Sequence, residues 1–371
     1  MNIFHICSYY HGSKVYFELF SSLDKVGVKQ HVFSPVKSER FKESPLPSGM
    51  NSHFSIARCH RDWMKISLLI KTIFSFIYVN KRLRSVIKDS ELIHAHTTFA
   101  DGFLAYLLSF FFKKEYIVNV RNTDVNIYLK YFPHLRFLCH LIFKKAKKVV
   151  FISPGHVSLI ETKYPKILQG IKYSIQPNGI NDFWHENSID FKANKAGNKI
   201  LFVGKFDNNK NIHSVVKAFK YCRNNLNLDC QLVLVGGDAV ELSNIGVFLD
   251  DDKHISVFDR LPKKKLLNLY RDSRVFVMPS FRETFGLVYI EALTQGVPVI
   301  CSLNQGIYGY INDARIAKFV NPNSATDIAS AIVSFFDTDF SDINFREVTE
   351  SFNWQLIARN YLYKIYGKDD L

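Results

Sequence analysis

Short apolar runs alternate with amphipathic stretches along the first half of the chain. An apolar run at residues 1–8 precedes a helical spacing over 15–25 and a second apolar run at 29–34. Because buried parallel strands read as short continuous apolar runs, this order predicts a strand, a helix and a strand. The theme repeats in further runs at residues 92–95, 116–120, 149–152 and 174–176.

A second series of the same kind begins after a polar stretch, residues 181–198, which we interpret as a linker. Helical spacing over 212–222 is surrounded by apolar runs at residues 199–203, 231–235, 254–258, 275–278 and 298–300. Two successive series predict an α/β protein with two facing Rossmann-like, doubly wound domains. Ligands of such sheets bind beyond the carboxyl ends of the strands, so a site is expected in the interdomain cleft.

The strongest motif follows the run at 275–278 and enters a helical stretch. Glu283 and Glu291 lie eight residues apart, and Phe285, Gly286 and Leu287 lie between them. Amides at a helix start can bind phosphate oxygens, glycine allows close backbone approach, and carboxylates accept hydrogen bonds from sugar hydroxyls. The alternative is an ordinary helix N-terminus, where the helix dipole favours an acidic side chain.

Cationic side chains follow the first strand of the second series. Gly204 and Lys205 come directly after the run at 199–203, and Lys210 follows on the same turn. Cations at this place can neutralise the charge that develops on a departing diphosphate. Taken alone, the two lysines would be interpreted as solvated surface.

Together these motifs resemble those of the family 4 retaining glycosyltransferases, which have the GT-B fold. The resemblance covers residues 177–300 and includes an interdomain crossing at 177–180 and a continuation at 292–300. It implies that Glu283 contacts hydroxyls of the donor sugar, that Glu291 binds the ribose, and that Lys205 and Lys210 hold the diphosphate. The family usually has Arg in place of Lys205, and residues 304–309 lack the Glu that relatives have there, so that loop is assigned no role.

The first half matches the family more weakly but offers three further candidates. Gly12 lies after the first strand, where a Rossmann fold brings the backbone close to a phosphate. His96 ends the run Ile93-His94-Ala95-His96, where relatives place a histidine near the donor sugar. Asp124 follows the next strand and resembles an acidic position near the site.

Charge is distributed unevenly between the two halves. Residues 1–180 hold 26 Lys+Arg and 11 Asp+Glu, a balance of +15, whereas residues 181–371 hold 22 and 23, a balance of −1. Basic residues accompany two aromatic, helical stretches at 63–88 and 128–148, which is typical of helices at a membrane interface. With the resemblance, this predicts peripheral attachment to an anionic membrane surface; a solubilising surface is the alternative. No nucleic-acid-binding motif is found, and nucleic acid is not expected as a partner.

The cysteines, the lengths of the apolar runs and one acidic tripeptide indicate the compartment and the use of metal. The six cysteines form no CxxC pair, which favours reduced thiols in a cytoplasmic protein, on the inner face of the plasma membrane. No leader peptide and no run long enough to span a bilayer are recognised. Asp250-Asp251-Asp252 is interpreted as an acidic turn and not as a metal site, so no cofactor and no obligatory metal are expected.

The resulting prediction is a retaining, metal-independent glycosyltransferase. It moves a sugar from a nucleotide sugar, expected to be a UDP-sugar, to a hydroxyl of a saccharide or lipid-linked acceptor, as in bacterial cell-surface polysaccharide or lipopolysaccharide synthesis. Its domains are expected at residues 1–180 on the acceptor side and 181–354 on the donor side, with a C-terminal helix near 355–371 packed on the first. A GT-B-fold nucleotide-sugar 2-epimerase and an inactive scaffold in a membrane complex are the alternatives.

Overall fold

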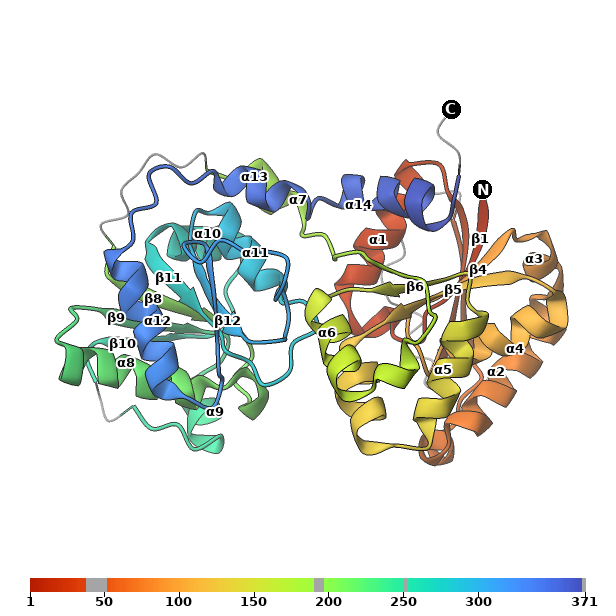
Figure 1. Cartoon of the computed structure of the whole chain (residues 1–371), viewed down its shortest axis with the longest axis horizontal. Coiled ribbons are helices and arrows are strands. Elements are labelled where there is room, and N and C mark those ends of the chain that lie inside the picture. The colour runs from red at the N-terminus through yellow and green to blue at the C-terminus, as the bar shows by residue number, and fades with distance from the viewer. Residues whose placement is uncertain (38–51, 190–196, 250–251, 369–371) are drawn as a thin grey trace. The chain divides into compact units, whose positions relative to one another are not determined.

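The structure is a computed structural model, and it describes residues 1–37, 52–189, 197–249 and 252–368. The chain forms two compact units. Unit 1 comprises residues 1–152, 156–179 and 354–371, and unit 2 comprises 153–155 and 180–353. The chain therefore leaves unit 1, builds unit 2, and returns to unit 1 at its C-terminal end (Figure 1).

Unit 1 contains one parallel sheet of seven strands in the order β3-β2-β1-β4-β5-β6-β7. Its central strands are almost fully buried, which is the reason that they read as unbroken apolar runs in the sequence. The strands are β1 (Asn2–Ile6), β2 (Lys29–Val36), β3 (Ser52–Arg58), β4 (Leu92–Ala95), β5 (Glu115–Val120), β6 (Lys148–Phe151) and β7 (Tyr173–Ile175).

Helices cover both faces of this sheet and form a separate apolar core on each. One core contains side chains of α1 (Lys14–Lys25), α14 (Trp354–Asn360) and the final turn Tyr361–Ile365. The C-terminal segment thus completes the layer that α1 begins. The other core lies under α2 (Leu68–Arg82), α3 (Arg84–Asp89), α4 (Gly102–Phe112), α5 (Leu135–Lys145) and α6 (Pro154–Lys163). Short turns lie at Tyr10–Gly12, where Tyr10 belongs to the first core, and at Asp62–Ile66, Asp124–Leu129 and Pro165–Ile167.

Unit 2 repeats the design with a parallel sheet of six strands in the order β10-β9-β8-β11-β12-β13. The strands are β8 (Lys199–Val203), β9 (Gln231–Val235), β10 (Ile255–Phe258), β11 (Ser273–Val277), β12 (Val299–Ser302) and β13 (Ala317–Val320). The helices are α7 (Asp182–Glu186), α8 (Ile212–Leu226), α9 (Ala239–Asn244), α10 (Lys263–Arg271), α11 (Leu287–Thr294), α12 (Ala325–Asp337) and α13 (Phe345–Glu350), with a short turn at Asn208–Lys210. Two Rossmann-like sheets confirm the predicted fold class.

Several local predictions need correction. The expected linker at 181–198 contains α7, whose Trp184 is fully buried and stacks edge-on against Tyr270, so it begins unit 2. Strands β3 and β13 were not predicted, since their polar and half-buried residues give no apolar run. The helical stretch at 63–88 is three separate pieces that end near Ile66, Arg82 and Asp89. Asp250 and Asp251 lie outside the described residues.

The six cysteines are free thiols, and none forms a disulfide. Burial raises the pKa of each of them above its usual value, to about 11 for Cys59 and Cys230. Among the helices of the described residues, none is long and apolar enough to cross a membrane.

Candidate functional site

The candidate site of unit 2 lies at the switch point of its sheet. From β8 the chain continues through β9 to β10 on one side, whereas β11, β12 and β13 lie on the other. The loops that follow β8 and β11 therefore leave neighbouring strands in opposite directions. In open α/β sheets, the crevice between two such loops is the usual place for a ligand.

An ion pair joins these two loops. The Lys210 ammonium, from the loop after β8, lies 2.6 Å from Oε2 of Glu283, in the loop after β11. The Lys210 side chain is 22% exposed and that of Glu283 is 12% exposed. The backbone of Lys210 is held by Asp207, whose Oδ1 accepts a hydrogen bond from the Lys210 amide at 3.0 Å. The structure thus brings together two of the residues that the sequence predicted.

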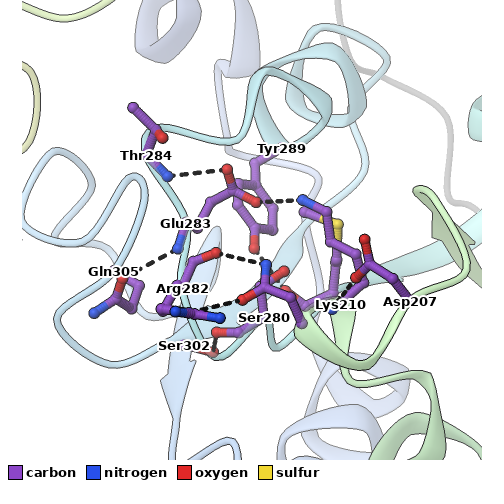
Figure 2. A network of polar contacts seen from close by, with 11 residues as sticks. Asp207, Lys210, Ser280, Arg282, Glu283, Thr284, Tyr289, Ser302 and Gln305 are labelled. Carbon is purple, nitrogen blue, oxygen red and sulfur yellow. Dashed lines mark hydrogen bonds and ion pairs between the residues drawn. The ribbon is translucent and has the colours of Figure 1, made fainter. Parts of the chain in front are cut away.

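Glu283 is fixed through its side chain and through its backbone (Figure 2). Its Oε1 accepts a hydrogen bond from the Thr284 amide at 3.0 Å, and its own amide donates to Oε1 of Gln305 at 3.1 Å. The Gly306 amide donates to the Glu283 carbonyl at 3.3 Å. Residues 304–309 were assigned no role from the sequence, and this was wrong, because Gln305 and Gly306 hold the Glu283 backbone in place.

Further hydrogen bonds tie the β11 loop to its neighbours. The Phe281 amide donates to the Asn209 carbonyl at 2.9 Å, and the Asn209 side chain returns a bond to the Arg282 carbonyl at 2.9 Å. The Ser302 hydroxyl, at the end of β12, donates to the Ser280 carbonyl at 2.6 Å. Three loops from adjacent strands are therefore cross-linked, so the carboxylate of Glu283 sits on a rigid support (Figure 2).

Helix α11 begins directly after this loop. Gly286 has a φ of +78°, a left-handed conformation that side chains disfavour, and no side chain caps the helix. Phe285 is buried against the rings of Tyr310 and Phe352, which anchors the loop before Leu287. The first amides of α11 are thus available as hydrogen-bond donors to an anion.

Glu291 lies within α11, eight residues after Glu283 in the sequence. The Tyr270 hydroxyl is 3.5 Å from its Oε2, and burial raises the pKa of this carboxyl to about 7, with the Lys263 charge acting in the opposite direction. Such a carboxyl is balanced between its protonated and ionised forms near neutral pH. The structure does not place it in contact with Lys210 or Glu283.

The first turn after β8 approaches the neighbouring strand closely. The Gly204 amide donates to the Val235 carbonyl at 2.9 Å, and a Cβ at Gly236 would collide with the Gly204 carbonyl. Lys205 follows with an exposed side chain, and in the described ranges it forms no ion pair. Its ammonium is therefore available to an anionic ligand, as the sequence predicted for a diphosphate.

In unit 1, His96 belongs to a buried group of three histidines at the switch point between β1 and β4. Its Nε2 lies 3.0 Å from Nδ1 of His5, and both side chains are fully buried. His94 bonds through both ring nitrogens, to the Tyr366 hydroxyl at 2.8 Å and to Oδ1 of Asn119 at 2.9 Å. Burial and the neighbouring charges lower the pKa of all three, so the rings are neutral.

The three histidines are spaced closely enough to hold a metal ion, with one ring nitrogen of each within 4.8 Å of the others. His94 already uses both nitrogens in hydrogen bonds, which favours a structural role for it. His5 was missed from the sequence, because it lies inside an apolar strand and no local signal distinguishes it from a core residue.

The remaining candidates of unit 1 are positioned as follows. Asp124 is buried, and its carboxylate accepts hydrogen bonds from the amides of Thr98, Phe99 and Arg121, at 3.0, 3.3 and 2.9 Å. It therefore clamps the loops after β4 and β5 to each other. Gly12 ends a short turn, where a Cβ would meet the exposed Tyr9 ring.

Comparison with known proteins adds the family context. Residues 185–349 match the model of the family "Glycosyl transferases group 1". D-inositol 3-phosphate glycosyltransferase of Paenarthrobacter aurescens is 30% identical over 43% of this chain, and the chain spans only 41% of that protein's length. Alpha-monoglucosyldiacylglycerol synthase of Acholeplasma laidlawii is 23% identical, over 82% of this chain and 80% of that protein.

Solved structures resemble the whole chain. Sucrose-phosphate synthase from Thermosynechococcus elongatus has a TM-score of 0.74 at 19% identity, covering 99% of this chain and 98% of that one. Anabaena Alr3699/HepE in complex with UDP-glucose has a TM-score of 0.66 at 12% identity, covering 99% and 100%. These likenesses extend the agreement in fold over both units. Residues 185–349 therefore carry the sequence pattern of the group 1 glycosyltransferases, and the chain as a whole has the GT-B fold.

Proposed function

We propose that this chain transfers a sugar from a nucleotide sugar to an acceptor hydroxyl. The observation that carries the proposal is the ion pair between Lys210 and Glu283 at the switch point of unit 2. A carboxylate held by backbone hydrogen bonds is suited to accept hydrogen bonds from the donor sugar, and the lysines are suited to the diphosphate.

The donor is proposed to be a UDP-sugar. HepE, which has the same fold, binds UDP-glucose. In the proposed arrangement the amides at the start of α11 and the ammonium groups of Lys205 and Lys210 contact the diphosphate. Glu291 would accept the ribose hydroxyls in its ionised form. Asp124 is proposed to position the loops after β4 and β5, and for His96 we propose the role near the donor sugar that the resemblance implies.

The transfer is proposed to retain the anomeric configuration without an obligatory metal. The acceptor hydroxyl attacks the anomeric carbon from the face that the diphosphate leaves. A new bond forms between the hydroxyl oxygen and that carbon, and the bond from the carbon to the diphosphate oxygen breaks. The hydroxyl proton passes to the departing diphosphate. Lysine ammonium groups then stabilise the charge that develops on the leaving group.

The acceptor is proposed to be a saccharide or a lipid-linked saccharide, used on the cytoplasmic face of a bacterial membrane. Two considerations support this choice: the basic balance of the first half, and a relative that is named for the synthesis of a glycosylated diacylglycerol. A nucleotide-sugar 2-epimerase of the same fold remains the second candidate. It would convert the donor without any acceptor.

Variants of the ion pair test the proposal. Glu283→Ala and Lys210→Ala should each lower the turnover of UDP-sugar by about 100-fold, or about 2.7 kcal/mol in the barrier, because a preorganised contact to the reacting groups is lost. Turnover is followed as UDP release, and the anomer of the product is read by proton NMR. Lys147→Ala and Glu115→Ala serve as matched controls. They break an exposed ion pair of unit 1 in which Nζ of Lys147 and Oε2 of Glu115 are 2.8 Å apart.

Near-normal turnover in both variants would contradict the assignment of this site. Thermal unfolding of each variant separates a local loss of chemistry from a loss of the fold. An inverted product would contradict retention, and mass-neutral conversion of the nucleotide sugar without acceptor would establish the epimerase instead.

A further inference from the structure

Helix α2 packs on the core of unit 1 through Val79 and the partly buried Phe76, and it turns a second set of apolar side chains toward solvent. Leu69 and Ile73 are 56% and 52% exposed, and Ile77 is also exposed, whereas Thr72 and Ser75 are only 2% exposed. Residues four apart lie on one face of a helix, so Leu69, Ile73 and Ile77 form a single stripe. A surface helix usually presents polar side chains on the face opposite to its core contacts. The core contacts of α2 therefore do not explain this stripe.

The exposed apolar surface continues on both sides of α2. Trp63, in the turn before the helix, is 56% exposed, and its ring lies edge-on to that of Phe74. Helix α4 lies beside α2 (Figure 1). At the C-terminal end of α4, Phe110 and Phe111 are exposed, and the Phe111 ring lies edge-on to that of Phe76 in α2. The apolar face, as we name it, comprises Trp63, Leu69, Ile73, Phe74, Ile77, Phe110 and Phe111.

A basic pocket adjoins this face. It has a volume of about 760 Å³ and includes Phe74 and Ile77 in its lining, together with residues from the ends of β2 and β3 and the last turn of α2. Five of its side chains are cationic and one is acidic, namely Lys37, Arg58, Arg61, Lys81 and Arg82 with Asp62. Asp62 pairs with Lys37 at 3.7 Å. Throughout the part of the chain that the structure describes, the other four cations form no ion pair.

From this juxtaposition we propose that unit 1 binds the surface of an anionic phospholipid bilayer. Lipid phosphates occupy the basic pocket, and the apolar face enters the boundary between head groups and acyl chains. Cations beside exposed apolar side chains are the combination that such an interface requires. The inference rests on the proposed transfer to a membrane-side acceptor, but the surface and the donor site belong to different units and can fail separately.

Other occupants fit the same observations less well. A second copy of the chain, paired through the same patch by a two-fold axis, would place the unpaired cations of both pockets close together, which charge repulsion opposes. A soluble phosphorylated molecule would use the pocket and leave the apolar face without a partner. A nucleic acid would likewise gain nothing from the Leu69, Ile73 and Ile77 stripe.

Sedimentation with vesicles tests the proposal on the full chain. We expect binding to vesicles of phosphatidylcholine with 30% phosphatidylglycerol at low salt, and at least about tenfold weaker binding to phosphatidylcholine alone, since each cation near the surface contributes several-fold. The double variant Arg58→Gln/Arg82→Gln should weaken binding to the anionic vesicles by about tenfold, and Leu69→Ser/Ile73→Ser by a similar factor. All four residues are exposed, so the fold should be retained.

Two matched controls remove the same charge and the same kind of surface elsewhere. Lys264→Gln/Lys265→Gln lies on exposed positions of α10, and Val240→Ser lies on an exposed position of α9, both in unit 2. Both should bind within about twofold of the original chain. Binding of UDP-glucose, followed by thermal shift, should be unchanged in every variant, which separates this proposal from the one about the donor site.

Several outcomes would overturn the proposal. These are failure of the original chain to bind anionic vesicles, equal losses in the pocket variant and the Lys264/Lys265 control, and normal binding by the Leu69/Ile73 variant. Competition by inorganic phosphate combined with normal binding of that variant would indicate a soluble phosphorylated ligand. A dimer in solution that the Leu69/Ile73 variant dissociates would indicate an interface between copies.

Discussion

At Glu283, a single residue is held by the two neighbouring loops, those after β8 and β12. Its side chain pairs with Lys210, and its amide and carbonyl bond to Gln305 and Gly306. Substrate-facing groups need this kind of support, because a carboxylate that moves by an ångström loses most of its effect on the barrier. The charge of Glu291, by contrast, depends on the pH, because burial raises the pKa of its carboxyl to about 7.

The pKa of Glu291 leads to a prediction with two opposite effects. Since its pKa in the folded chain is about 7 and exceeds the unfolded value, the folded state binds more protons between pH 4.5 and 7. Stability contributed by this group is therefore present at low pH and is lost as the pH rises through about 7. Glu291→Gln should raise Tm at pH 8 and change it little at pH 5.

The same variant should weaken donor binding if the ionised carboxyl accepts ribose hydroxyls. The dissociation constant for UDP-glucose, measured by calorimetry, should rise by about tenfold at pH 8. In the original chain, affinity should fall as the pH decreases from 8 to 6. A variant with unchanged Tm at pH 8 would show that the carboxyl is not destabilised by burial, and unchanged affinity would remove it from the donor site.

At the scale of elements, the start of α11 depends on one backbone conformation. Gly286 has a positive φ, and a Cβ there would collide with the Tyr289 ring, whose hydroxyl is fixed by a 2.6 Å bond to the Met278 carbonyl. The ring cannot move aside without breaking that bond. The entry into α11, and with it the orientation of the helix amides, is therefore set by a glycine.

Gly286→Ala should destabilise the chain by about 2–4 kcal/mol, from backbone strain plus the displaced ring. Gly246→Ala is the matched control, because Gly246 has a φ of +75° but no atom within 4 Å of an added Cβ. It should cost only about 1 kcal/mol, the strain alone. Urea unfolding measures both free energies, and equal losses in the two variants would contradict the clash.

The sequence predicted elements well where burial is complete and poorly where it is not. Strands β4, β8 and β9 were predicted with their observed bounds, because buried strands give continuous apolar runs. Strand β3, at the edge of its sheet, has half-exposed positions and no such run. For α2, the apolar spacing correctly predicted a helix, but it could not reveal that Ile73 and Ile77 face outward while Val79 is buried.

The candidate site was predictable in part for a similar reason. Glu283 and Lys210 belong to local motifs with fixed spacing, and the structure brings them together. Gln305 and His5 act through contacts with residues 22 and 91 positions away, respectively. No local pattern marks such residues, because their roles depend on how strands from distant parts of the chain are ordered in the sheet.

At the scale of the whole molecule, unit 1 is built from both ends of the chain. Trp354, Ile357 and Tyr361 belong to the same apolar core as α1, and the Tyr366 hydroxyl bonds to His94. Unit 2 needs none of these contacts for its own sheet. The C-terminal segment therefore stabilises the unit that the N-terminal half of the chain begins.

Removal of residues 354–371 should unfold or loosen unit 1 and leave unit 2 intact. The apolar core beside α1 would lose several large buried side chains, each of which contributes roughly 1.5–3 kcal/mol to the free energy of unfolding. Hydrogen exchange followed by mass spectrometry should show lost protection in β1 and β4 and retained protection in β8 and β11. Truncation at 368, which removes only residues 369–371, is the control. Loss of protection in both units would contradict their independence.

The buried thiols have a practical consequence for studying motion between the units. Alkylating reagents react with exposed thiolates, and burial raises the pKa of all six native cysteines. Five of the thiols are buried and Cys59 is partly exposed, so maleimide dyes should label the native chain at Cys59 alone, and slowly, at neutral pH. After replacement of Cys59 by Ser, a pair of cysteines introduced on the surface, one in each unit, could carry a fluorescence donor and acceptor.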